Sequence, residues 1–258
     1  MALMKRLGRG LLSWVSIIVL IALWEGFARA HIVSDFLLPS FSETITRLWH
    51  DLLTGDLVVG LGLTLYRAFI GFAIAAVFGI AIGILIARVA ALRWFFDPLV
   101  SIGLPMPKIA FLPIFVLWFG VFDESKIMMV AFSAIFPVIV ASWAAAEDID
   151  RTMIWSAMTL GATQNQILRE IAFPAALPQI FTGLQVAVPI SLIVAIVSEM
   201  AMGGEGLGGS LMTQMRFADS PGVFSGIVAI AIVGSIVVKA MELVRRRVLV
   251  WHAETQAA

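Results

Sequence analysis

Long apolar runs separated by short polar stretches dominate this sequence. A membrane-spanning helix needs roughly 20 mostly apolar residues, and five clear runs approach or exceed that length: 11–28, 60–87, 127–146, 177–201 and 223–244. A sixth run, 98–121, contains Pro105, Pro107 and Pro113. Prolines kink helices, and a membrane tolerates a broken helix only where neighbouring protein satisfies the freed backbone groups. The pattern predicts six transmembrane helices, with five as the alternative count. The helix formed by the proline-containing run 98–121 is expected to be broken and to lie inside the bundle.

Composition agrees with a membrane location. Of the 258 residues, 61% are hydrophobic and only 13% are charged, and the mean hydropathy is +1.02. Soluble domains average about 45–50% apolar and about 25% charged residues. The fold class expected is therefore an all-α integral membrane protein.

Charge and residue usage argue against several kinds of site. The formal net charge is zero, so we expect no nucleic-acid partner. The chain has no cysteine, which excludes disulfides and thiolate chemistry. Its histidines, His31, His50 and His252, lack the i, i+4 spacing of a metal-binding helix. We expect no metal site and no catalytic residue.

The N-terminus, M-A-L-M-K-R-L-G-R-G, places basic residues before an apolar run, as a signal peptide does. The run is nevertheless about as long as a spanning helix requires, roughly 20 residues. No clear small-x-small cleavage site precedes Trp24. We therefore expect a retained first transmembrane helix.

The distribution of lysine and arginine predicts how the chain is oriented, because short cytoplasmic loops carry the excess. With the N-terminus inside, the cytoplasmic side receives Lys5, Arg6, Arg9, Arg88, Arg93, Arg151, Arg169, Arg245, Arg246 and Arg247. The opposite side receives only Arg29, Arg47, Lys126 and Arg216. Both termini and the polar segment 147–174 are therefore expected in the cytoplasm.

Two segments are expected on the outer side. Residues 38–53 read as a short amphipathic helix capped by Ser40 or Ser42, with Trp49 and Leu52 on its apolar face. Residues 203–211, G-G-E-G-L-G-G-S-L, are expected to be too glycine-rich for a stable helix. For both, a plain connecting role and a specific contact role remain open.

The segment 147–174 is polar and amphipathic although it lies between two apolar runs. Ile154, Ala157, Ile167 and Ile171 form an apolar stripe at helical spacing. Gly161 costs about 1 kcal/mol of helix stability relative to alanine. We therefore expect a short helix, a turn at Gly161 and a second helix. A short exposed helix of this kind suits docking into a groove of another protein.

This segment resembles the E-A-A, x3, Gly, x9, I-x-L-P motif of permease subunits in ATP-binding-cassette importers that depend on a substrate-binding protein. Trp155-Ser156-Ala157 aligns with E-A-A, and Gly161, Ile171 and Pro174 match at the motif's spacing. Trp155 replaces the glutamate, and Phe173 replaces the leucine. In that family the segment is the coupling helix that contacts the ATPase subunit.

Residues 97–120, the D-E-S-K of 123–126 and residues 196–208 resemble the nitrate, sulfonate and taurine branch of the same family. The resemblance covers most of residues 60–250. It implies a type I importer fold with both termini inside: an N-terminal helix and external linker (1–59), a permease core (60–250) and a C-terminal tail (251–258).

The resemblance also implies partners and a location. These are a second copy of the chain, two cytoplasmic ATPase subunits and an extracytoplasmic binding protein, all at the bacterial inner membrane. ATP and Mg²⁺ belong on the ATPase subunit, because this chain has no G-x-x-x-x-G-K-[ST] loop. The substrate expected is a small solute such as nitrate, a sulfonate or taurine; pyrimidine precursors of thiamine and aromatic acids remain alternatives within the family.

Two sets of residues follow as site candidates. The expected ATPase contact is at Ser156, Ala157, Met158, Thr159, Leu160, Gly161, Ala162, Gln164 and Ile167. The expected translocation path or gate contains Glu199, Ser191, Lys108 and Met200. Because an anionic substrate repels a carboxylate, we favour a structural or gating role for Glu199, which would hold the glycine-rich loop through backbone amides.

Ionisable residues at membrane depth are functional candidates because burying them is costly. Besides Glu199 and Lys108, Arg67 and Lys239 qualify. Snorkelling to the interface explains Arg67 as well as a functional role does, and it is the favoured explanation for Lys239. For Lys108, a salt bridge or an anchor at the membrane edge competes with a place on the path.

Three other functions compete with an importer permease. Secondary transporters often show inverted repeats, and no internal repeat is visible here. A membrane-embedded enzyme needs clustered histidines or carboxylates at one depth, whereas the runs hold isolated charges. A channel subunit leaves segment 147–174 unexplained.

Overall fold

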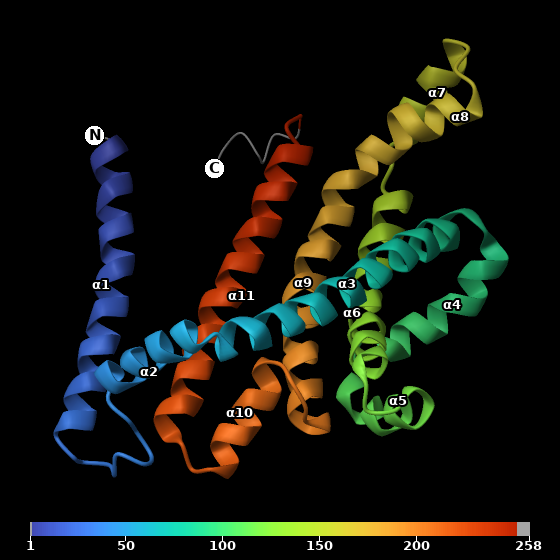
Figure 1. Cartoon of the computed structure of the whole chain (residues 1–258). Helices are drawn as coiled ribbons and strands as arrows, with labels where there is room; N and C mark the ends of the chain where they lie inside the picture. Colours follow the sequence, from blue (N-terminus) through green and yellow to red (C-terminus); the bar gives the residue numbers. More distant parts are fainter. Residues whose placement is uncertain (1, 252–258) are drawn as a thin grey trace.

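The computed structural model describes residues 2–251, and of residues 2–14 it describes the backbone only; the secondary structure of the described residues consists of helices joined by turns and loops (Figure 1). Residues 252–258 of the expected tail, and the side chains of Lys5, Arg6 and Arg9, lie outside that description. The elements are α1 (Ala2–Arg29), α2 (Phe41–Thr54), α3 (Asp56–Arg88), α4 (Ala90–Gly103), the 3₁₀ turn η1 (Lys108–Phe111), α5 (Leu112–Phe119), α6 (Asp123–Glu147), α7 (Arg151–Thr159), α8 (Gln164–Gln166), the π-helical segment η2 (Ile167–Ala172), α9 (Phe173–Met202), α10 (Leu207–Arg216) and α11 (Ser220–Val248).

Within the described residues, four helical stretches are long and apolar enough to cross a membrane: 56–88, 123–147, 164–202 and 220–248. They contain the runs expected from the sequence. The proline-rich run is broken as expected: α4 and the η1–α5 unit form a pair bent by 102°, which makes a fifth span if counted as one. Its expected place inside the bundle is wrong for this chain, because only Val100, Gly103 and Phe115 of α4 and α5 are buried while Trp94 and Leu117 are exposed. The run 11–28 lies within α1.

The centre of the bundle is the packing of α3 and α9 on α6. Along α3, small residues recur every fourth position at Gly71, Ala75, Gly79 and Gly83, and all four are buried. A methyl group at Gly79 would lie 2.8 Å from the Cβ of Val138 on α6. Small residues let helix backbones approach closely in a membrane, where van der Waals packing drives association. This close approach fixes the relation of α3 to α6.

The helix ends separate into two groups along the bundle. In Figure 1 the N-terminal end of α1, the C-terminal end of α11 and the α7–α8 unit lie at the upper end. The lower end holds the α1–α2 connection, α5 and α10. The first turn of α1, the last turn of α11 and the polar α7–α8 unit therefore lie at the same end of the molecule.

The helix α2 packs against both α1 and α11 at the lower end. Ser40 caps α2 in a capping box: its Oγ accepts the Glu43 N–H at 3.2 Å, and the Glu43 carboxylate accepts the Ser40 N–H at 3.2 Å. Trp24 of α1 donates its Nε1–H to the Pro39 carbonyl at 2.9 Å. Arg47 pairs with Asp219, which precedes α11, at 2.8 Å. The cap predicted at Ser40 is therefore confirmed.

The glycine-rich segment differs from expectation, because a helix, α10, begins inside it at Leu207. Buried side chains satisfy the first amides of this helix: Leu207 N–H bonds Thr64 Oγ1 at 2.9 Å, and Gly208 N–H bonds Glu199 Oε2 at 3.0 Å. A side chain at Gly208 would overlap the carbonyl oxygen of Ile196. The prediction was wrong because tertiary contacts here outweigh the low helix propensity of glycine.

Candidate functional site

Four charged side chains meet at the lower end of the bundle, and we call them the charge cluster: Arg67 of α3, Asp123 and Lys126 of α6, and Glu199 of α9. Arg67 is 3% exposed and Glu199 is 0% exposed. Arg67 Nη1 lies 2.6 Å from Glu199 Oε1, and Arg67 Nη2 lies 2.7 Å from Asp123 Oδ1. One guanidinium therefore connects the three central helices.

Arg67 also binds the glycine-rich segment, because its Nη1 donates to the Glu205 carbonyl at 2.7 Å. This contact corrects the snorkelling explanation, under which the Arg67 head group would reach water at the membrane surface. The fork of guanidinium donors, which binds carboxylates in a fixed geometry, instead points into the bundle. Arg67 is the main residue missing from the gate predicted by the sequence.

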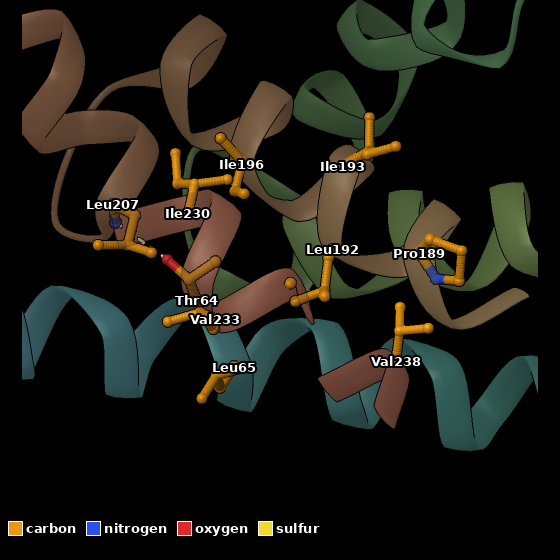
Figure 2. A pocket seen from close by; sticks show the side chains of 11 residues that line it. Thr64, Leu65, Pro189, Leu192, Ile193, Ile196, Leu207, Ile230, Val233 and Val238 are labelled. Atoms are coloured by element: carbon orange, nitrogen blue, oxygen red, sulfur yellow. Dashed lines mark hydrogen bonds between the residues drawn. The ribbon is translucent and has the colours of Figure 1, made fainter. Parts of the chain in front are cut away.

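Glu199 makes polar contacts with two other elements. Its Oε2 lies 2.8 Å from Thr64 Oγ1 on α3 and accepts the Gly208 N–H of α10. Figure 2 shows Thr64 pointing toward the backbone of Leu207. A buried carboxylate is tolerated only when paired and hydrogen-bonded, and Glu199 meets both conditions. The structure places Glu199 against a backbone amide of the glycine-rich segment, as the structural interpretation expected.

Lys126 completes the cluster and is buried in the first turn of α6, at 3% exposure, although the sequence suggested an outer loop position. Its Nζ donates to the Gly203 carbonyl at the end of α9, at 3.3 Å. Two cations and two carboxylates therefore balance in formal charge. Such balance makes the buried cluster tolerable inside a membrane protein.

Two hollows border this region. An apolar pocket of about 160 Å³ lies between α3, α9 and α11 with Thr64 on its wall (Figure 2). An open depression of about 650 Å³ is lined by Arg67, Phe119, Val121, Phe122, Asp123, Glu124 and Glu205. Thr64 thus borders an apolar pocket, whereas Arg67 and Asp123 line an open, partly charged depression.

The other predicted path residues lie apart from the cluster. Ser191 borders an apolar groove of about 510 Å³ between α3, α9 and α11, and its Oγ donates to the Ala187 carbonyl at 2.8 Å. Met200 is half-buried. Lys108 lies at the break between α4 and η1, where its Nζ donates to the Leu104 carbonyl at 2.8 Å and sits 5.2 Å from the centre of the Phe136 ring. Lys108 therefore holds the broken backbone together.

At the upper end, α7, the following turn and α8 form the tip, residues 151–166. Asp150 caps α7 by accepting the Thr152 N–H at 2.8 Å, and this backbone hydrogen bond holds the pKa of Asp150 below its ordinary value. Gly161 has φ +84°, a left-handed conformation that favours glycine. Thr163 and Gln166 form a capping box that begins the next helix. The expected order of helix, glycine turn and helix is confirmed.

The tip exposes large apolar side chains. Leu160 is 88% exposed and Trp155 is 61% exposed. Of the nine residues predicted to contact the ATPase, Ala157 and Ile167 are buried, and Ala162 is half-buried; Ser156, Met158, Thr159, Leu160, Gly161 and Gln164 are exposed. The buried side chains of Ala157 and Ile167 therefore pack inside the tip. Trp155, which the set predicted from the sequence omitted, belongs to the exposed apolar surface of the tip. The signal for Trp155 was its departure from the glutamate of the family motif.

The sequence is similar to known families and proteins. The family model described as "Binding-protein-dependent transport system inner membrane component" matches residues 79–250. The chain is 30% identical to a putative aliphatic sulfonates transport permease protein, SsuC, of Bacillus subtilis, over 97% of this chain and 92% of that protein. It is 28% identical to the taurine transport system permease protein TauC of Escherichia coli, over 95% and 91% of the two chains. It is 32% identical to the formylaminopyrimidine transport permease protein ThiX of Halalkalibacterium halodurans, over 96% and 99%.

The fold is also similar to that of a solved structure. A chain of the MetNI methionine ABC transporter, in an inward-facing conformation, superposes with a TM-score of 0.67 at 20% identity. The match covers 77% of this chain and 98% of that one. At this level of identity the likeness establishes a shared fold.

Proposed function

The chain belongs to the family of binding-protein-dependent transport system inner membrane components, and from this membership we propose that a homodimer of it forms the translocation path of a sulfonate importer. The chain is a multi-pass inner-membrane permease subunit of an ATP-driven importer. It is not itself an enzyme; a separate ATPase subunit drives transport, and a substrate-binding protein is its other partner. We expect ATP and Mg²⁺ to bind on that ATPase.

The proposed topology has six spans with both termini in the cytoplasm. The four long apolar stretches and the bent α4–α5 pair supply five, and α1 would be the sixth. The shared position of the first turn of α1, the last turn of α11 and the tip in Figure 1 supports this orientation. Because the chain has no cysteine, single cysteines at Gln164 and at Thr54 would react from opposite sides of sealed vesicles; labelling of both from one side would contradict the topology.

The exposed apolar surface of the tip is the observation that best supports its role as the ATPase contact. Leu160 and Trp155 project from a short, doubly capped helical unit at the end of the bundle. Exposed aromatic and aliphatic anchors on a helix suit insertion into a hydrophobic groove. In the proposed complex, Trp155 replaces the polar contact that the family motif makes through glutamate.

Co-purification tests this contact. The wild-type chain, co-expressed with the ATPase encoded beside it, is expected to retain that ATPase through detergent purification. Leu160→Asp is expected to lose it, whereas Asn165→Asp, which adds the same charge at an exposed polar position of the tip, serves as the matched charge control and is expected to retain it. Equal retention by the two variants would contradict the assignment.

The charge cluster is the proposed outer gate. Arg67 and Glu199 join α3 to α9, and both bind the segment that leads into α10. Importers of this kind alternate between discrete packing states by rigid-body movement. A cluster that is complete in only one of those states would set the balance between them. In this scheme Ser191 lies on α9 about two turns from Glu199 on the cytoplasmic side of the gate, Met200 lies beside Glu199 at the gate itself, and Lys108 braces the neighbouring broken span.

The proposed substrate is a small sulfonate, with taurine included. Two of the similar proteins carry names that specify aliphatic sulfonates and taurine, while ThiX is named for formylaminopyrimidine. Uptake competition among taurine, an alkanesulfonate and formylaminopyrimidine, with the chain in complex with its own binding protein, separates these classes. Transport of the pyrimidine alone would overturn the sulfonate assignment.

A further inference from the structure

The connection between the tip and α9 contains a rare backbone conformation. Residues 164–202 form one uninterrupted helical stretch, so no loop separates the tip from the membrane span. Within it, η2 (Ile167–Ala172) is π-helical, and the Phe173 N–H bonds the Leu168 carbonyl five residues earlier. π-Helices account for well under 1% of residues in proteins and are frequent at functional sites.

Pro174 provides a physical reason for this segment. It follows η2 directly, in the first turn of α9. Proline has no N–H, and inside an α-helix its ring collides with the carbonyl four residues earlier, which here belongs to Glu170. Widening the preceding turn to π spacing relieves that collision. The α-helical alternative meets this collision and the widened turn does not, so the two forms are closer in energy than in an ordinary helix.

The ends of η2 are anchored while its middle is not. Ile167 is 5% exposed, and Ala172 is 2% exposed. Leu168, Arg169 and Glu170 between them are exposed. A change of helical spacing in the middle therefore disturbs little packing, whereas the anchors transmit the change to the tip on one side and to α9 on the other.

We propose that η2 is the joint through which movement of the ATPase reaches the bundle, by switching between π and α spacing. In an α-helix each residue adds a rotation of about 100° and a rise of about 1.5 Å. Absorbing the extra residue of the π-helical turn would therefore rotate and shift the tip relative to α9 by about these amounts. The joint would let the tip turn against α9 without unfolding the connection. This inference rests on the proposed contact between the tip and the ATPase.

Deleting Glu170 tests the joint directly. The deletion brings Leu168 and Phe173 to i, i+4 spacing, so the same carbonyl and amide can bond in α geometry and the widened turn is removed. The deletion variant is expected to retain the ATPase and its basal hydrolysis, while ATP-driven uptake in proteoliposomes falls roughly 5- to 150-fold, the range of typical allosteric coupling. The matched control, Glu170→Ala, keeps the chain length and is expected to transport within about twofold of wild type, as exposed substitutions do.

Pro174→Ala provides an independent variant without a change in length. It supplies the missing amide, favours the α form and is expected to reduce uptake per ATP hydrolysed, with the ATPase still bound. Uptake at the wild-type rate by either variant would contradict the proposal that η2 is a joint. If the deletion variant fails to assemble, normal transport by Pro174→Ala alone would contradict it. If the wild-type chain itself retains no ATPase, the proposed function fails instead, so the two failures are distinguishable.

Discussion

Replacing Glu199 by glutamine is the most informative perturbation of the proposed gate. Glutamine has nearly the same shape and keeps an acceptor oxygen for the Gly208 amide and the Thr64 hydroxyl. It loses the negative charge that faces Arg67 at 2.6 Å. We expect Glu199→Gln to impair transport while the complex with the ATPase still assembles.

The expected size follows from the contacts. A hydrogen bond to a charged group contributes about 1.5–3 kcal/mol. Glu199→Gln removes one such bond, because the glutamine NH2 that then faces Arg67 Nη1 is itself a donor, while Arg67 keeps Asp123 at 2.7 Å. If the cluster is complete in one transport state only, a loss of that size shifts the balance between states by roughly 10- to 150-fold. Glu199→Ala leaves the Gly208 amide without an acceptor and Arg67 without one of its two carboxylate partners. Removing one partner of a buried ion pair lowers the free energy of unfolding by about 3–5 kcal/mol.

Two assays separate stability from gating. Unfolding of the purified complex in detergent is expected to rank wild type, Glu199→Gln and Glu199→Ala in decreasing stability. The double variant Arg67→Met/Glu199→Leu removes both charges of the pair, so no unpaired charge of the pair remains buried. It is expected to recover only part of the loss, because Asp123 and the Gly208 amide still lose their partners. Its transport is nevertheless expected to stay impaired. Full ATP-driven uptake by Glu199→Gln, or by the double variant, would refute a gating role for the pair.

Four further predictions concern the tip and the broken span. Gly161→Trp is expected to abolish retention of the ATPase in co-purification while membrane insertion persists, whereas Gly161→Ala adds only the left-handed strain of about 1–2 kcal/mol; retention by the tryptophan variant would contradict this. Asp150→Ala is expected to weaken the same association by uncapping α7, and Asp150→Asn, also a good cap, to preserve it. Because the pKa of Asp150 is lowered on folding, its contribution is complete above the ordinary pKa of 3.8 and is lost as pH falls below that value through the folded pKa. Protection of the α7 amides, measured relative to their intrinsic exchange rate at each pH, is therefore expected to fall at acid pH, and protection that is the same at neutral pH and well below pH 3.8 would contradict this. Lys108→Met is expected to reduce uptake with the ATPase retained, because the Leu104 carbonyl at the break loses its donor; unchanged uptake would show that the brace is dispensable.

The sequence predicted those features that depend on local pattern. The apolar runs located α3, α6, α9 and α11, because hydropathy over about 20 residues decides whether a helix can span a membrane. Proline positions located the break after α4. The turn at Gly161 was predictable because one residue's backbone preference determines it.

Features that depend on distant contacts were not predictable. Arg67 and Glu199 are 132 residues apart in the chain, so nothing local identifies them as partners. The start of α10 among glycines depends on Thr64 and Glu199, which satisfy its first amides. The π-helical spacing of η2 had a local signal in Pro174, but the sequence alone does not say whether such a proline kinks, ends or widens a helix.

ATP hydrolysis by the reconstituted complex tests the central claim most directly. The chain, its neighbouring ATPase and its neighbouring binding protein would be placed together in lipid, and hydrolysis would be measured with and without a sulfonate on the binding protein. A permease subunit that couples the two partners predicts stimulation only when the loaded binding protein and this chain are both present. Hydrolysis that is indifferent to this chain would contradict the account.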